Sequence, residues 1–166
     1  MKKIGLLSDT HAYYHPRIEE FFKEVDEIWH AGDFGSAEIY ERLNKFKPVR
    51  AVYGNIDGIE LRSLLKETTI FNCEEVKVLI THIGGYPGHY HLGIKKILQK
   101  EDIRLFICGH SHILKVVNDK DLNILHINPG ASGIQGFHQR ITMIRFKINK
   151  TQIEDLEVFD APRILG

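Results

Sequence analysis

The chain has 166 residues, and its apolar content of 43% is enough to build one hydrophobic core. We therefore expect a single domain over residues 1–166. Lys and Arg together number 22, as do Asp and Glu, so the charge gives no support to nucleic-acid binding, although it does not exclude a nuclease. No apolar stretch approaches a membrane span, and Cys73 and Cys108 give no disulfide framework. A reducing cytoplasm is the expected setting.

Five short runs of apolar, β-branched and aromatic residues predict buried strands. In chain order these runs are Lys3–Ser8, Glu27–Ala31, Val49–Tyr53, Val76–Ile80 and Ile103–Cys108. Apolar residues at helical spacing predict helices between them, at His15–Val25, Ser36–Phe46 and His91–Lys100. From about Ile113 the pattern changes to strands, with hairpin turns at 118–123 and 149–151. This order favours an α/β fold in which two facing mixed β-sheets form a sandwich flanked by helices.

A short polar block follows each of the five predicted strands. The blocks are Asp9-Thr-His11, Gly32-Asp33, Gly54-Asn55, Thr81-His82 and Gly109-His110-Ser-His112. If the strands lie side by side in one sheet, their carboxyl ends meet at one edge and the blocks share a crevice. Two carboxylates, one amide and four imidazoles are the ligand set that a pair of divalent metals requires. The blocks together predict a two-metal hydrolytic site.

Each block alone has a plain structural explanation. Gly-Asp and Gly-Asn are common turn dipeptides, and a lone histidine such as His82 at a strand end is usually hydrogen-bonded to its surroundings. Only the Gly-His-x-His block that ends at His112 is moderately specific for a metal. The metal interpretation therefore depends on all five blocks occurring together, in this order, at strand ends.

The five blocks resemble, in order, the signature of the calcineurin-like metallophosphoesterases. The short length is similar to that of the small bacterial and archaeal phosphodiesterase branch of this superfamily. The resemblance extends from about Lys2 to Arg145 and includes Asn128–Ser132, which is similar to the Asn-Pro-Gly-Ser segment of that branch. It implies the calcineurin-like fold and hydrolysis of a small phosphate diester by water activated at a dinuclear metal centre.

The resemblance also implies a division of the ligands between two metals. One metal would be held by Asp9, His11, Asp33 and His112. The other would be held by Asp33, Asn55, His82 and His110, so that Asp33 is the bridge. The resemblance indicates Mn²⁺ as the commonest activator, whereas the ligand types equally suit Ni²⁺, Zn²⁺, Fe²⁺ or Co²⁺, and Mg²⁺ is a further alternative.

The residue after Asn55 departs from part of the superfamily. Many of its phosphomonoesterases carry a histidine there, which protonates the leaving group or holds the phosphate, but this chain has Ile56. Isoleucine donates no proton, and general acid catalysis is typically worth about 10²–10⁴-fold, so hydrolysis of monoesters with poor leaving groups should suffer. The next residue, Asp57, matches an acidic residue that is often present in the diesterase branch.

Contacts with the substrate are harder to assign. The candidates are Asn55, Asp57, His89 and His138. His89 belongs to the Gly84–His91 loop, which follows His82 and either frames the substrate, closes as a lid or is merely an exposed loop. His30 either supports a metal ligand or is a core-edge histidine that bonds to the backbone.

A non-catalytic function is the alternative hypothesis. The retromer subunit built on this fold is a protein-binding scaffold whose metal pocket has lost histidine ligands. This chain keeps all seven expected ligands, which favours an enzyme. The expected partner is a small phosphate-ester substrate and not a membrane, while the sequence leaves a homo-oligomer open.

Overall fold

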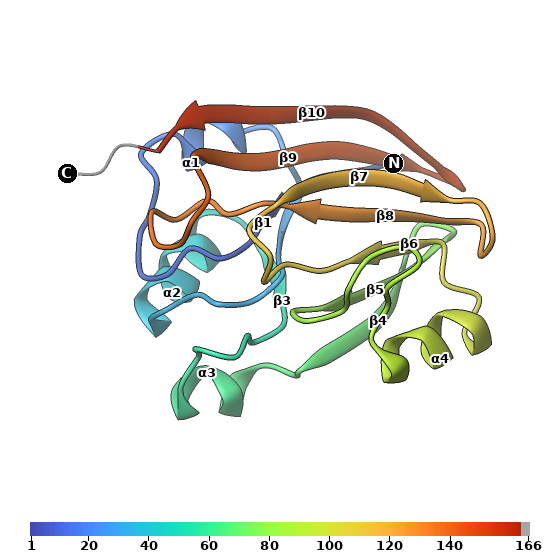
Figure 1. Cartoon of the computed structure of the whole chain (residues 1–166). Helices are drawn as coiled ribbons and strands as arrows, with labels where there is room; N and C mark the ends of the chain where they lie inside the picture. The colour runs from blue at the N-terminus through green and yellow to red at the C-terminus, as the bar shows by residue number, and fades with distance from the viewer. Residues whose placement is uncertain (164–166) are drawn as a thin grey trace.

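The computed structural model describes residues 1–163, which form two five-stranded sheets and four helices (Figure 1). The strands of the first sheet are β1 (Lys2–Leu7), β2 (Glu27–His30), β3 (Val49–Ala51), β9 (Arg140–Asn149) and β10 (Gln152–Pro162). The strands of the second sheet are β4 (Thr68–Cys73), β5 (Val76–Thr81), β6 (Leu105–Ile107), β7 (Leu114–Asp119) and β8 (Ile124–Pro129). The helices are α1 (Ile18–Phe21), α2 (Ala37–Phe46), α3 (Ile59–Leu64) and α4 (Leu92–Lys100).

Both sheets are mixed. The first has the order β10-β9-β1-β2-β3, in which β1, β2 and β3 are parallel and β9 runs antiparallel to β1 and β10. The second has the order β4-β5-β6-β8-β7, in which β5, β6 and β8 are parallel and the edge strands are antiparallel. The parallel strands of both sheets end on the side where β8 points in Figure 1, so two sets of strand ends open onto the same end of the molecule.

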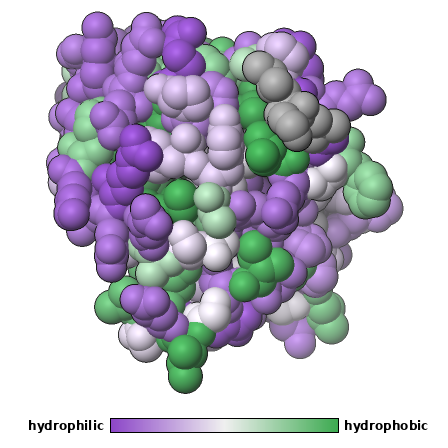
Figure 2. Space-filling model, turned by 90° about the vertical axis from the view of Figure 1, so that its left-hand side faces the viewer, coloured by the Kyte–Doolittle hydropathy of each residue, from purple (hydrophilic) through white to green (hydrophobic). Residues whose placement is uncertain are grey.

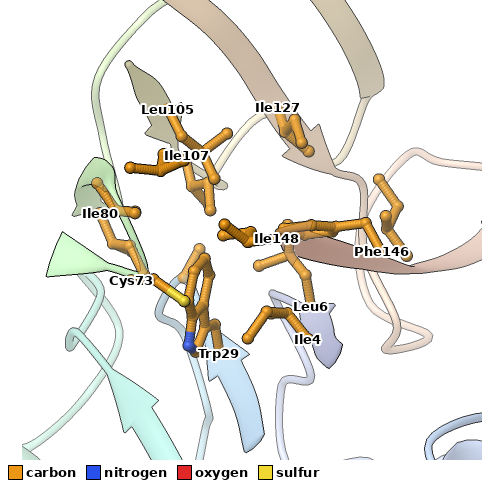
Figure 3. Close-up of a cluster of buried hydrophobic side chains, with 14 of the residues drawn as sticks. Ile4, Leu6, Trp29, Cys73, Ile80, Leu105, Ile107, Ile127, Phe146 and Ile148 are labelled. Carbon is orange, nitrogen blue, oxygen red and sulfur yellow. The ribbon is translucent and has the colours of Figure 1, made fainter. Parts of the chain in front are cut away.

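The central core lies between the two sheets (Figure 3). Ile4, Leu6 and Trp29 from the first sheet pack in one cluster with Ile80 and Ile107 from the second. A second cluster fills the space between the first sheet and the helices α1 and α2, and a third lies between the second sheet and α4. Because each sheet is covered on both faces, its central strands are almost continuously apolar.

The predicted sandwich with flanking helices is confirmed, as are both hairpins in the second half of the chain. The five polar blocks do not lie at the edge of a single sheet. The first three blocks follow β1, β2 and β3 of one sheet, whereas the last two follow β5 and β6 of the other. The crevice is therefore formed by two facing sheet edges.

The first helix is shorter than predicted, and two elements were not predicted. Helix α1 covers only Ile18–Phe21, because the chain turns at Val25, whose N–H donates to Phe22, to bring Asp26 against β1. Strand β4 and helix α3 lie in a stretch for which the sequence analysis proposed no element. None of the helices within residues 1–163 is long and apolar enough to cross a membrane.

Close packing of α1 on the first sheet generates a prediction for Gly5. A Cβ atom added at Gly5 would lie 2.7 Å from Cδ1 of Phe22, so Gly5→Ala overpacks this contact. We expect a loss of about 1–3 kcal/mol in the free energy of unfolding, measured by urea denaturation. Gly93→Ala in α4 is the matched control, because nothing lies within 4 Å of its added Cβ. An equal effect of the two substitutions would contradict this account.

Candidate metal centre

The five polar blocks meet at the end of the sandwich where the parallel strands finish. Asp9 follows β1, Asp33 follows β2, and Asn55 lies beyond β3, while His82 directly follows β5 and His110 lies just beyond β6. Figure 2 views the molecule from this side and shows a mainly hydrophilic surface interrupted by small apolar patches. Residues that are up to about a hundred positions apart in the chain therefore share one site.

Most of the predicted ligands have an unusual backbone conformation. Five of them have positive φ angles: Asp9 (54°), His11 (45°), Asp33 (61°), His110 (70°) and His112 (62°). Non-glycine residues rarely adopt this left-handed region, and conformations of this kind persist only where the surroundings impose them. Here hydrogen bonds between loops do so, since Asp9 N–H donates to the Gly32 carbonyl (3.0 Å) and His11 N–H to the Asp33 carbonyl (3.1 Å).

The ligand atoms form two groups. The first consists of Asp9, His11 and His112, and the second of Asp33, His82 and His110. Within each group, one oxygen or nitrogen atom per residue lies within 4.8 Å of the others. Asn55 adjoins the second group, with its Oδ1 3.1 Å from Nδ1 of His110. The structure thus brings all seven predicted ligands together, in the two groups that the resemblance implies.

Asp33 lies between the two groups. Its Oδ2 is 3.5 Å from Nε2 of His11 in the first group and 3.1 Å from Nε2 of His82 in the second. Its Oδ1 accepts the N–H of Ile56 (3.0 Å), which fixes the orientation of the carboxylate. This is the position that a bridging ligand requires.

One carboxylate oxygen of Asp9 accepts hydrogen bonds from the protein, and the other has no hydrogen-bond partner within residues 1–163. Its Oδ2 accepts hydrogen bonds from the Ser8 hydroxyl (2.6 Å) and from the N–H of His110 (3.1 Å). Its Oδ1 is buried without a hydrogen-bond partner, as are Nε2 of His11 and Nε2 of His82. Leaving buried polar atoms unpaired is costly, and divalent cations held by the two groups would satisfy all three. The residues therefore fit a metal centre.

The charges of the site are coupled. Burial raises the pKa of Asp9 and Asp33, but the neighbouring imidazoles outweigh burial and hold both pKa values below their ordinary range. The contact with Asp9 raises the pKa of His11, and for His82 the two carboxylates more than offset the lowering by burial. Without metal, the carboxylates thus favour a proton on His11 and on His82. A metal must displace these protons, so its affinity falls as the pH decreases.

The orientation of His82 is fixed by the backbone. Its Nδ1 donates to the carbonyl of Ala31 (2.8 Å), so this nitrogen carries a proton. The other nitrogen, Nε2, therefore faces the two carboxylates and is the one that can bind a metal. A histidine that ligates a metal commonly makes such a bond through its second nitrogen.

The orientation of His112 is fixed by a hydrogen bond to His138. Nε2 of His138 lies 2.8 Å from the carbonyl of Gly133 and must donate to it, so Nδ1 of the neutral ring is an acceptor. Nδ1 of His112, 3.1 Å away, then donates to His138, and Nε2 of His112 is left facing Asp9 Oδ1 at 3.2 Å. The structure thus gives His138, predicted as a substrate contact, a role in orienting His112.

Asp57, another predicted substrate contact, accepts hydrogen bonds from the backbone. Its carboxylate is buried and accepts the N–H groups of Asp33, Phe34, Gly35 and Gly54 at 2.8–3.3 Å. These bonds join the loop that carries Asp33 to the loop that carries Asn55. Asp57 is therefore a positioning residue, and its spacing in the sequence gave no sign of these partners.

His30 and His89 lie outside the two ligand groups. Nδ1 of His30 accepts the N–H of Gly32 (3.0 Å), and its Nε2 donates to the hydroxyl of Thr10 (3.1 Å). Burial lowers the pKa of His30 to about 3, so the ring is neutral and links the first two blocks. His89 is exposed and packs against Tyr86, with 4.9 Å between ring centroids. Its contact with a substrate stays a prediction.

The bond between His138 and His112 generates a prediction. We expect His138→Ala to weaken metal binding about 10- to 100-fold, because the His112 ring loses its fixed orientation. Titration calorimetry of the metal-free protein with Mn²⁺ measures this effect. The exposed neighbour Gln139, changed to Ala, is the control. Equal affinities of the His138→Ala and Gln139→Ala variants would contradict the role of His138.

Comparisons with known proteins identify the family. Residues 1–151 match the model of the calcineurin-like phosphoesterase superfamily domain. A probable metallophosphoesterase from Methanocaldococcus jannaschii is 31% identical over 134 residues, which are 77% of this chain and 67% of the relative. The phosphoesterase YfcE from E. coli shares the fold, with a TM-score of 0.67 at 21% identity over 93% of this chain and 98% of that one. So does wild-type Vps29 from Entamoeba histolytica, complexed with Zn²⁺, with a TM-score of 0.71 at 15% identity over 98% of this chain and 99% of that one. The chain belongs to the calcineurin-like phosphoesterase superfamily.

Proposed function

We propose that the protein is a phosphodiesterase that hydrolyses a small phosphate diester with water activated by a dinuclear metal centre. Family membership makes it a metal-dependent phosphoesterase, and the proposal adds the diester preference and the second metal. The observation that carries the proposal is the position of Asp33, whose carboxylate lies within 3.5 Å of a histidine from each of the two ligand groups.

The chain's own residues hold and orient the site. Asp9 and Asp33 supply the negative charge, while His82 and His112 present nitrogens whose orientation the Ala31 carbonyl and His138 impose. When bound, two divalent cations supply an activated water and neutralise the charge of the phosphate. We propose Mn²⁺ as the activating metal. The Zn²⁺ complex of the similar Vps29 supports Zn²⁺ as an alternative.

The preference for diesters follows from the leaving-group side of the site. Ile56 is 45% exposed beside Asn55, and its N–H is bonded to Asp33, so neither part of this residue protonates a leaving oxygen. Without a general acid, a substrate must carry a leaving group that is stable as an anion. An activated diester meets this requirement, whereas an alkyl monoester does not.

A protein-binding scaffold is the alternative function. The fold is shared with Vps29 at low sequence identity, and a shared fold leaves function open. The complete set of seven ligands favours catalysis, because a scaffold has no need to keep buried, unpartnered ligand atoms.

Substitution of the bridging residue tests the proposal. We expect Asp33→Asn to abolish Mn²⁺-dependent hydrolysis of bis-p-nitrophenyl phosphate, because the amide weakens the bridge between the metals. The fold should persist, since an amide oxygen still accepts the N–H of Ile56. His82→Ala and His110→Ala should each lower turnover by orders of magnitude, while Lys120→Gln on the β7–β8 turn is the control. A wild-type protein without metal-dependent turnover would instead support the scaffold.

The residue at position 56 generates a separate prediction. With wild-type protein we expect kcat/KM to fall steeply as the leaving-group pKa rises in a series of aryl diesters, and alkyl monoesters to be poor substrates. Ile56→His should raise monoesterase activity relative to diesterase activity, because the ring can donate a proton on this side. Shallow dependence on the leaving group in the wild-type protein would mean that another residue acts as the acid.

A further inference from the structure

A cavity of about 320 Å³ adjoins the metal centre and shares His110 with it. It is bounded by the Gly84–His91 loop, by the block that carries His110, and by strands β7 and β8. Its lining includes Tyr86, His91, Ser111, Lys115, His126 and Asn128. A larger hollow of about 850 Å³ lies at the opposite end of β5, where Val76 lines it, and so is remote from the ligands. Two further hollows also share residues with the site, one of about 170 Å³ lined by Asn55 and His82 and one of about 300 Å³ lined by His112 and His138, and the cavity beside His110 is the largest of these three.

Lys115 gives this cavity its charge. Among the residues of the described chain that line it, Lys115 is the one with a permanent charge, and none of them is acidic. Its ammonium lies over the ring of Tyr86, 4.0 Å from the centroid. No carboxylate within residues 1–163 forms a salt bridge with Lys115, whereas Lys77 and Lys147 each have one. The ammonium is therefore positioned on the cavity wall and free to pair with an anion.

His126 is a rigid part of the cavity wall. Its side chain is 1% exposed, and its Nδ1 is buried without a hydrogen-bond partner. The ring packs on Phe106, with 5.0 Å between centroids, so it cannot turn away from the cavity without loss of this contact. The ring therefore forms a fixed aromatic part of the cavity wall behind Lys115.

We propose that this cavity binds an ester group of the substrate, and that Lys115 pairs with a second anionic group, a phosphate or a carboxylate, on that ester group. The inference rests on the proposed function, since it places the scissile phosphate at the metal centre beside His110. The substrate class is then phosphodiesters that carry a second anionic group away from the scissile phosphate. The apolar side chains of Ile83 and Ile113, which also line the cavity, would contact the carbon chain between the two anions.

Three diesters with the same p-nitrophenyl leaving group test the inference. Their second ester groups are propyl, 3-carboxypropyl and 3-phosphonopropyl, so that the two anionic arms distinguish carboxylate from phosphate. We expect wild-type protein with Mn²⁺ to prefer at least one anionic substrate over the propyl ester by about tenfold in kcat/KM, as for a hydrogen-bonded charge pair. Lys115→Gln should lose this preference, so that its kcat/KM values for the anionic and the propyl esters become similar, whereas Lys120→Gln should keep the wild-type ratio. An unchanged preference in Lys115→Gln would overturn the inference.

A binding measurement separates this inference from the proposed function. Protein with ¹³C-methylated lysines and diamagnetic Mg²⁺ is titrated with propane-1,3-bisphosphonate, 3-phosphonopropanoate or propylphosphonate, none of which is hydrolysed. We expect the Lys115 signal, assigned by its absence in Lys115→Gln, to shift with the two probes that carry a second anionic group and not with propylphosphonate. If the Lys115 signal shifts in a protein that hydrolyses no diester, the proposed function is wrong and the anion site at Lys115 still stands. No shift would overturn the inference regardless of activity.

Discussion

Asp9 and Asp33 place two negative charges in one buried end of the sandwich, and the rest of the site is arranged around them. Both carboxylates are at most 2% exposed, so water does not screen their repulsion. Imidazoles from both sheets approach within 3.1–3.8 Å of them, and the carboxylates favour protons on His11 and His82 when no metal is bound. Divalent cations would satisfy the carboxylates and the unpartnered ring nitrogens together. The arrangement of carboxylates and ring nitrogens is therefore better suited to binding divalent cations than to holding protons on the histidines.

Such a site requires loops that are held rigidly against electrostatic repulsion. Asp57 does this by accepting four backbone N–H groups from the loops of Asp33 and Asn55, and His30 does it by linking Thr10 to Gly32. Gly54 is needed for the same reason, because a Cβ atom there would overlap the side chain of Asp33. The left-handed ligand residues are stable in this setting because neighbouring loops determine their backbone hydrogen bonds.

The sequence predicted the parts of this structure that depend on local pattern. The buried strands were recognisable because both faces of each sheet are covered, and the ligands because they follow those strands directly. The pairing of strands was not predictable in this way, since the assignment of β5 to a second sheet depends on contacts far apart in the chain. The roles of Asp57 and His138 were missed for the same reason. An aspartate or a histidine at these positions could equally well contact a substrate. Only their hydrogen-bond partners in the structure show that they hold other site residues in place.

The two sides of the metal centre suggest how substrates are selected. Under the proposed function, the site has no proton donor at Ile56, so the chemistry there would favour any ester with a good leaving group and would discriminate little between organic groups. Discrimination must then come from binding, which is differential only where the protein contacts the remainder of the substrate. The proposed contact lies in the cavity beside His110, where the Lys115 ammonium is part of the wall. The proposed selectivity thus combines a requirement for a good leaving group at Ile56 with an anion contact at Lys115.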